Sequence, residues 1–470
     1  MMQKKEFSTD FILNGKGLLL FVSNITLLYF HRISTVFLLY FHDISIVFQP
    51  YFNCISIVFL KKRYHYSLLL AIIIFPSFLR SQPLDSLIRR AMENNYEIRA
   101  LEQEYQAAIQ RAPQVSQLPD PEVGLGIFAL PVETRLGPQW VRLGATQMFP
   151  WKGKLKAQED AVLAMARAYF ERIGAQRLNL RYKISQAYFQ LYELGATQDI
   201  LRRNLRIFQV LEEIALARVE SGKASLADVL RVQSKRLELE KELERLENRK
   251  AGPVSAIHQL TGSPAEGIIM TEDTLGPAVL PFFRDSLLAA IRENHPALSA
   301  LQWEQEAARR RIRLNELDGK PGLGVGLDYI FVGKRDDADP ERNGRDILSP
   351  RVMVQLPLYR KKYDAREREE ELKIAALDNR QEDKILQFAA TIESAYADYR
   401  DAMLQLELYE EQVELIRASI EILHASYSND GASFDELLQL QNDLVNYDKM
   451  RLKAIVKTHL AKAEVEKLMP

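Results

Sequence analysis

Cysteine is almost absent from this chain of 470 residues, which contains only Cys54. One thiol can form neither an intrachain disulfide framework nor a thiolate metal cluster. The seven histidines show no H-E-x-x-H or other ligand spacing, and no P-loop, nucleophile-elbow or dinucleotide-binding motif occurs. The formal net charge of −1 lacks the basic excess of most nucleic-acid binders. We therefore expect no catalytic residues, no metal site, no cofactor and no nucleic-acid partner.

Charge is also scarce in residues 1–60, which are rich in aromatic and β-branched side chains. The motif Ile-Ser-x-Val-Phe recurs there every 11 residues, beginning at Ile33, Ile44 and Ile55. A membrane hairpin is one interpretation, although charged residues leave no clean run of about 20 apolar residues, the length of a spanning helix. We favour a mis-annotated extension, translated from upstream DNA. Leu60 would then be the true start if its codon is an alternative initiator.

Residues 61–82 have the anatomy of a secretory signal peptide. Residues 61–63 form its basic region, and residues 67–78 form an apolar region that is too short for a stop-transfer helix. A polar stretch follows, so we expect cleavage near residue 83. The mature chain would then be exported and would contain no cysteine that could carry a lipid anchor.

The mature chain contains two copies of one unit. Landmarks of the first copy return in the same order in the second, at an offset that grows from 200 to 208 residues. The pairs are Asp85 and Asp285, Gly124 and Gly324, Pro150 and Pro357, and Tyr188 and Tyr396. Shared landmarks in one order are evidence of an internal repeat. We therefore assign repeat 1 to residues 83–275 and repeat 2 to residues 276–470.

Each copy begins with a helical segment (84–112 or 284–316) and later contains a very long helix (153–218 or 362–427). Apolar residues recur at intervals of three and four along the long helices, and the other positions are charged or polar. At 1.5 Å per residue such a helix extends for about 100 Å. An apolar stripe of that length cannot be buried alone, so we expect antiparallel coiled-coil pairing with the helix that closes each copy.

Two short runs of alternating residues precede each long helix. In 322–331 the odd positions are apolar and the even positions are mostly small or polar, and the runs 122–130, 139–148 and 350–356 show the same period of two. This period predicts strands with one apolar and one polar face. Aromatic residues near the ends suit transmembrane strands, and the alternative is an ordinary hairpin with one wet face. Four strands cannot close a barrel, and lipid does not tolerate open strand edges. Strands in a membrane would therefore have to come from several chains that share one barrel, and three chains would supply twelve strands.

A glycine-containing break follows each long helix. The first break contains Gly222, with Ser225 in the position of a helix N-cap, and the second contains Gly431 and Ser433 in the same arrangement. An acidic residue three positions after each serine completes a capping-box pattern. We therefore expect a hairpin tip at each break.

This combination resembles the TolC-type outer membrane factors, the outer membrane efflux protein family. The resemblance covers residues 83–470 and rests on the duplicated helix–strand–strand–helix–helix unit, the tip motifs 219–230 and 427–438, and the strand-to-helix junctions at Pro150 and Pro357. It implies a homotrimer with a shared twelve-stranded transmembrane β-barrel in the outer membrane, which an α-barrel continues across the periplasm. The implied partners are outer membrane lipid, a periplasmic adaptor (membrane fusion protein) and an inner-membrane pump of the RND type.

The implied function is that of a passive exit duct in a tripartite efflux or type I secretion-like system. In the family the gate lies near the second tip and uses an aromatic residue and carboxylates, which map onto Tyr427, Asp435 and Glu436. The family often has a basic residue inside this tip, where this chain has Ala432. The alternative is that the two carboxylates only favour the N-terminus of the following helix.

Both tips are also candidate contacts for the adaptor. The residues are Gly222, Ser225 and Leu226 in the first tip and Gly431, Ser433 and Phe434 in the second. Small residues would let another helical hairpin approach closely, and the alternative is plain turn chemistry. The loops 131–138 and 333–348 join strands, so we expect them to face outside the cell.

A rival to the exit duct is a periplasmic coiled-coil scaffold or adaptor without a membrane barrel, which the strand segments argue against. A soluble enzyme with helical insertions is a third hypothesis, and it lacks any catalytic constellation. A tube lined by mixed polar groups is not a selective site. Metal ions, drugs and peptides are therefore all compatible with the sequence as exported molecules.

Overall fold

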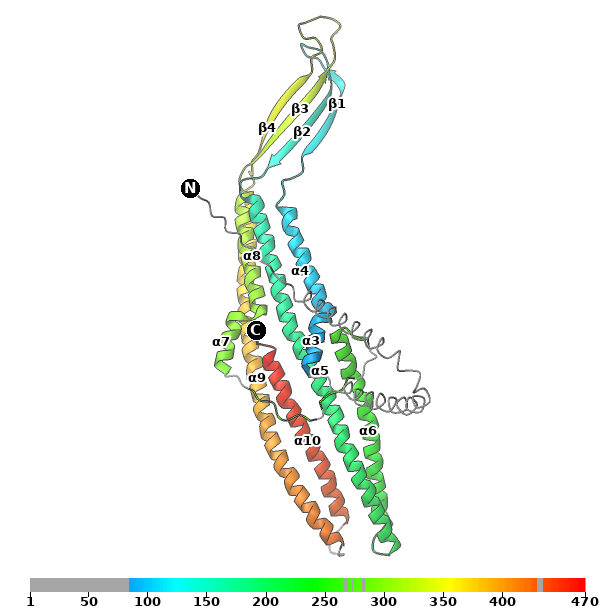
Figure 1. Ribbon diagram of the computed structural model, residues 1–470. Helices are drawn as coiled ribbons and strands as arrows, with labels where there is room; N and C mark the ends of the chain where they lie inside the picture. Colours follow the sequence, from blue (N-terminus) through cyan, green and yellow to red (C-terminus); the bar gives the residue numbers. More distant parts are fainter. Residues whose placement is uncertain (1–83, 265–268, 273, 281–283, 429–433, 470) are drawn as a thin grey trace, which may run out of the picture. The chain divides into compact units, whose positions relative to one another are not determined.

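The computed structural model describes residues 84–264, 269–272, 274–280, 284–428 and 434–469, all within the unit Ser81–Pro470 (Figure 1). The expected extension (1–60) and signal peptide (61–82) lie outside the described residues. The elements are α3 (Leu84–Asn94), α4 (Tyr96–Val115), β1 (Glu122–Val132), β2 (Gln139–Phe149), α5 (Lys154–Glu220), α6 (Leu226–Thr261), α7 (Arg284–Asn294), α8 (Pro296–Asp318), β3 (Gly322–Val332), β4 (Ile347–Gln355), α9 (Lys361–Ser428) and α10 (Phe434–Glu466). The two repeats therefore have the same order of elements, as the duplication predicts.

The helical segment that opens each repeat is divided into two helices. Asn95 caps α4, because its Oδ1 accepts hydrogen bonds from two backbone N–H groups of the first turn, at 3.0 and 3.1 Å. At the matching place His295 caps α8, with Nδ1 accepting from the N–H of Ala297 at 3.1 Å. A capping side chain stabilises a new helix start. The segments predicted over 84–112 and 284–316 are therefore each two helices.

The cap at His295 depends on a neutral imidazole. The residue is 4% exposed and its ring lies 4.4 Å from that of Phe388. Burial lowers the pKa of His295 to about 4, and the charge of Lys384 acts in the same direction. Protonation would turn Nδ1 from an acceptor into a donor. Because the pKa is lower in the fold than the ordinary value of 6.5, this site loses stability as the pH falls from 6.5 to about 4.

The four strands form one antiparallel sheet in the order β1-β2-β3-β4, so that β2 of repeat 1 pairs with β3 of repeat 2. Directly paired residues share a face. One row contains Leu125, Leu143, Tyr329 and Leu348, and the neighbouring row on the opposite face contains Gly124, Gly144, Asp328 and Ser349. Within the described chain β1 and β4 are the outer strands, each paired along one edge only.

The alternation predicted from the sequence is confirmed. Large apolar residues of all four strands are exposed on one face, which we call the apolar face. Its exposed residues are Val123, Leu125, Ile127, Leu143, Leu323, Val325, Leu327, Tyr329, Phe331, Leu348, Val352 and Val354. The fourth strand begins at Ile347, so the loop expected over 333–348 is shorter by two residues at its end.

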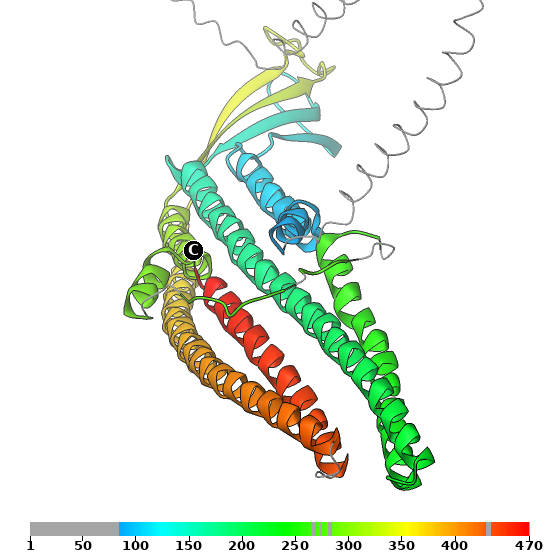
Figure 2. The ribbon, with the colours of Figure 1, turned by 60° about the horizontal axis from the view of Figure 1, so that its bottom comes forward.

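The long helices form two hairpins, α5 with α6 and α9 with α10, and α5 also packs against α10 (Figures 1 and 2). Matching glutamines from the shorter helices reach polar residues of α5. Gln233 donates to Glu212 at 2.8 Å, and Gln441 donates to Asn204 at 3.1 Å. The expected antiparallel pairing is confirmed, with Phe208 among the fully buried side chains. None of the helices that the structure describes combines the length and the hydropathy of a membrane span.

The segment between the repeats crosses the long helices without regular structure, over its described residues 269–272 and 274–280. Side chains satisfy its backbone: Tyr188 Oη accepts from the N–H of Glu272 at 3.1 Å, and Thr458 Oγ1 accepts from the N–H of Ala278 at 2.9 Å. Buried backbone groups require such partners. The connection therefore ties α5 of repeat 1 to α10 of repeat 2.

Candidate functional site

The tip of the α5–α6 hairpin folds as the sequence predicts. Gly222 adopts a φ of +73°, in the left-handed region that favours glycine after a helix end. Ser225 Oγ accepts from the N–H of Ala227 at 3.1 Å, and Asp228 Oδ2 accepts from the N–H of Ser225 at 3.3 Å. This capping box starts α6 and leaves the side chain of Leu226 61% exposed.

At the α9–α10 hairpin the described residues resume at Phe434. Gly431 and Ser433 lie outside the described residues, as does the side chain of Tyr427 near the end of α9. Phe434 is 5% exposed and belongs to the main hydrophobic core, so its ring packs inward. Asp435 and Glu436 occupy the first turn of α10, and both are exposed.

A cation from the first tip contacts the second. Arg231 of α6 donates to Asp435 of α10 at 3.2 Å and to Asp228 of its own helix at 3.4 Å. The pair lines a groove of about 330 Å³ between the two hairpins, together with Lys235 and Gln439. The structure thus places a basic residue of the first tip against Asp435 of the second hairpin.

Sequence reasoning did not identify Arg231. The repeat offset of 208 places it opposite Gln439, so one copy has a cation where the other has an amide. This difference between the copies was the only sequence signal that could have pointed to Arg231. It does not name the partner, because Arg231 and Asp435 are 204 positions apart in the sequence. The pair is exposed on both sides, and such pairs contribute roughly 0–1 kcal/mol, so this contact can be broken at little cost.

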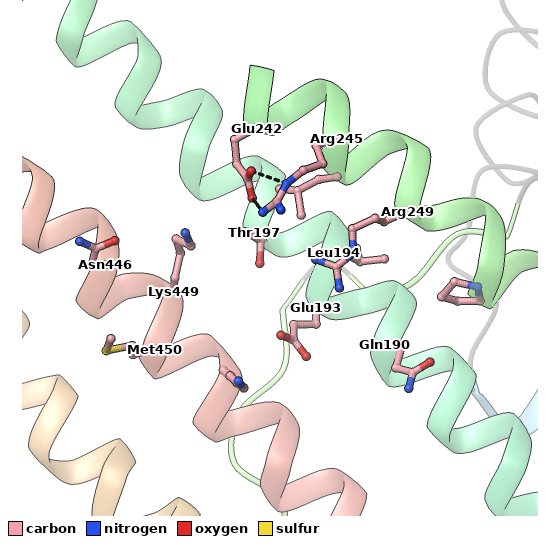
Figure 3. A pocket seen from close by; sticks show the side chains of 13 residues that line it. Gln190, Glu193, Leu194, Thr197, Glu242, Arg245, Arg249, Asn446, Lys449 and Met450 are labelled. Atoms are coloured by element: carbon pink, nitrogen blue, oxygen red, sulfur yellow. Dashed lines mark hydrogen bonds and ion pairs between the residues drawn. The ribbon is translucent and has the colours of Figure 1, made fainter. Parts of the chain in front are cut away.

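A second, larger groove of about 630 Å³ lies between α5, α6 and α10 (Figure 3). Arg245 donates two hydrogen bonds to Glu242, at 2.6 and 2.7 Å, and these lower the pKa of that carboxyl. Burial raises the pKa of Glu193, while Lys453 and Arg249 oppose the rise. Within the described residues no three His, Cys, Asp or Glu side chains cluster as metal ligands. The lining is therefore of mixed charge.

The face of the sheet opposite the apolar face carries a buried carboxylate. The side chain of Asp328 is 5% exposed. Its carboxylate forms an ion pair with Arg142 at 2.7 Å and a second, longer one with Arg351 at 3.6 Å. Arg351 also donates to Thr146 at 3.0 Å. A methyl group added at Gly144 would overlap Asp328, so this glycine makes room for the carboxylate. The cluster joins β2, β3 and β4 on a face that is polar at its centre.

A family model matches the part of the chain that contains the first sheet hairpin and the first helical hairpin. Residues 87–263 match the family described as "Outer membrane efflux protein". This part of the chain belongs to the outer membrane efflux protein family. No curated protein sequence matches the chain.

Solved structures share the fold at low sequence identity. The channel CusC is 15% identical with a TM-score of 0.68, over 83% of this chain and 92% of that one. VceC of Vibrio cholerae is 17% identical with a TM-score of 0.65, over 82% and 95% of the two chains. The open MtrE channel of Neisseria gonorrhoeae is 14% identical with a TM-score of 0.63, over 82% and 88%. These likenesses establish the mainly helical fold with its four-stranded sheet.

As an outer membrane efflux protein, the chain is a channel of the outer membrane that extends into the periplasm, and not an enzyme. The resemblance inferred from the tips, the junctions and the duplication is confirmed. A periplasmic scaffold without membrane strands is set aside by the family membership.

Proposed function

We propose that three copies of the chain pool their sheets into one twelve-stranded barrel and act as the passive exit duct of a tripartite efflux system. The observation that carries this proposal is the sheet itself. Its apolar face is exposed, and β1 and β4 each have one edge without a partner strand in the described chain. Lipid does not tolerate open strand edges, and closure with neighbouring copies removes them.

The duct would be closed at the hairpin tips. Asp435 and Glu436 stand in the first turn of α10, and Tyr427 precedes them at the end of α9. The contact of Asp435 with Arg231 supports a gate in which weak, exposed charge pairs hold the two hairpins together. Such a constriction can rearrange at low cost.

The same end of the molecule would dock on the periplasmic adaptor, above an inner-membrane pump of the RND type. Exposed Leu226 beside Gly222 and Ser225 supports a contact at the first tip, and Gly431 and Ser433 would contribute at the second. Phe434 packs inward and would shape this surface from beneath. Residues 83–275 and 276–470 are the two repeats in this proposal, and the loops after β1 and β3 face outside the cell.

Conductance across a planar lipid bilayer tests the proposal. The protein, purified from outer membranes in detergent and added to one side, is expected to give discrete single-channel steps. A control preparation from cells that carry the empty vector should give none. A protein that inserts no conducting unit under any voltage would contradict the exit-duct proposal.

A further inference from the structure

Basic residues gather where the strands of each repeat meet the long helices. We call Lys152, Lys320, Lys361 and Lys362 the basic collar. All four residues are exposed, and within the described chain no carboxylate lies within ion-pair distance of them. Lys362 instead lies 4.8 Å from the centre of the neighbouring Tyr363 ring. The collar therefore has positive charge that the described part of the chain leaves unneutralised.

The pattern occurs in both repeats, which is evidence that it is not incidental. Trp151 is followed by Lys152 and Lys154, and at the offset of 208 Tyr359 is followed by Arg360 and Lys362. The segments 150–156 and 357–366 together contain seven basic residues and one acidic residue. Three copies of the chain would therefore present six such segments around one barrel.

Asp318, the carboxylate that lines the junction cavity, is already paired. Asp318 at the end of α8 is contacted by Lys154 at 3.0 Å and by Arg366 at 3.8 Å. Arg360 donates to the carbonyl oxygen of Gly319 at 3.3 Å. These contacts fix the backbone of the junction and leave the four collar lysines available for a ligand.

A cavity and an apolar rim lie at the same place. The cavity, of about 330 Å³, is lined by Lys154, Lys320, Lys362 and Arg366 together with the aromatic rings at the junction. The apolar face continues into this region through exposed Phe149, Trp151, Leu356, Leu358 and Tyr359. Aromatic residues with adjacent lysines and arginines are typical of the level at which phospholipid headgroups meet water.

We propose that the basic collar binds the phosphate headgroups of anionic phospholipids, of the phosphatidylglycerol class, in the periplasmic leaflet of the outer membrane. The inference rests on the outer membrane location, and the assignment of the leaflet follows from the helices that leave the junction toward the periplasm. Each headgroup phosphate would lie among the collar lysines while its acyl chains follow the apolar face. Specific lipid would then fix the depth of the channel in the membrane.

Native mass spectrometry of the detergent-purified channel tests this inference. Equal amounts of phosphatidylglycerol and phosphatidylcholine with the same acyl chains are offered to the wild type and to the variant K152Q/K320Q/K361Q/K362Q. The matched control is K183Q/K235Q/K241Q/K250Q, which changes four lysines on α5 and α6. We expect the wild type and the control to retain phosphatidylglycerol at least threefold over phosphatidylcholine, and the collar variant to lose this preference.

A second measurement does not depend on the variant's folding. Raising NaCl from 0.05 to 0.5 M should strip phosphatidylglycerol from the wild type, because exposed charge interactions are screened. Equal retention of the two lipids by the wild type, or full preference in the collar variant, would overturn the inference. Preferential retention of lipid A would also overturn it, since that phosphate belongs to the other leaflet. The collar variant should keep wild-type conductance in a planar bilayer. This measurement separates failure of the lipid-binding inference from failure of the exit-duct proposal.

Discussion

Replacing Asp435 and Glu436 together by alanine is expected to raise single-channel conductance and the entry of vancomycin into cells severalfold. In the proposed gate Asp435 holds α10 to Arg231 of α6, and the double variant removes that contact together with the adjacent carboxylate. An exposed pair stores little energy, so its loss shifts the gate without unfolding the hairpin. The measurements are single-channel recording in a bilayer and growth at graded vancomycin concentrations.

Two controls separate gating from helix stability. The variant Glu240→Ala/Glu244→Ala removes two carboxylates of α6 away from the tip and should leave conductance unchanged. Arg231→Ala removes the partner of Asp435 without touching the first turn of α10, where carboxylates favour the helix dipole by about 0.3–1 kcal/mol. If Arg231→Ala were silent while the double variant unfolded the tip, the carboxylates would be capping groups only. Wild-type conductance and vancomycin entry in the double variant would remove the gate assignment.

Leu327→Arg is expected to abolish recovery of the channel from outer membranes. Leu327 lies on β3 in the middle of the apolar face, where it is 49% exposed and pairs with Ala145 and Pro350. A lipid-facing arginine at the membrane midplane costs about 2–4 kcal/mol, and a trimer would bear this cost three times. The measurement is the amount of protein in the outer membrane fraction and its shift on a gel after heating.

The opposite face supplies the matched control. Ser349→Arg places the same side chain on β4, in the row that contains Gly144 and Asp328. A cation there would lie beside a carboxylate and face the lumen, so normal amounts of heat-modifiable protein are expected. Equal membrane recovery of Leu327→Arg and Ser349→Arg would contradict the assignment of the apolar face to lipid.

Features that depend on local sequence were predictable. The period-two alternation of 322–331 arises because the two faces of a strand meet different surroundings. The register of β3 with β2 confirms that the alternating residues lie on opposite faces. The turn at Gly222 and the cap at Ser225 are also local, because they satisfy backbone groups within three residues. The long helices could be predicted from their apolar stripes alone.

Features that depend on contacts between residues far apart in the sequence could not be predicted. The division at His295 rests on a histidine kept neutral by burial, and a sequence does not display burial. The pairing of Arg231 with Asp435 joins the tips of two hairpins, and the role of Asp328 as the shared partner of two arginines requires the register of three strands. Each arises from tertiary contacts rather than from a local motif.

The pooling of strands is the central claim, and disulfide trapping between neighbouring copies tests it most directly. With Cys54 replaced by serine the chain has no thiol, so one cysteine on β1, at Leu125, is combined with one on β4, scanned from Leu348 to Val354. Facing cysteines can bridge only when their Cα atoms lie roughly 4.4–6.8 Å apart. We predict that, for at least one cysteine pair, oxidation of the membranes gives a ladder of disulfide-linked chains on a non-reducing gel that ends at three chains. The single-cysteine variants should give no such ladder. A protein that stays a single chain for every pair, in a fraction free of detergent and membrane, would contradict the account.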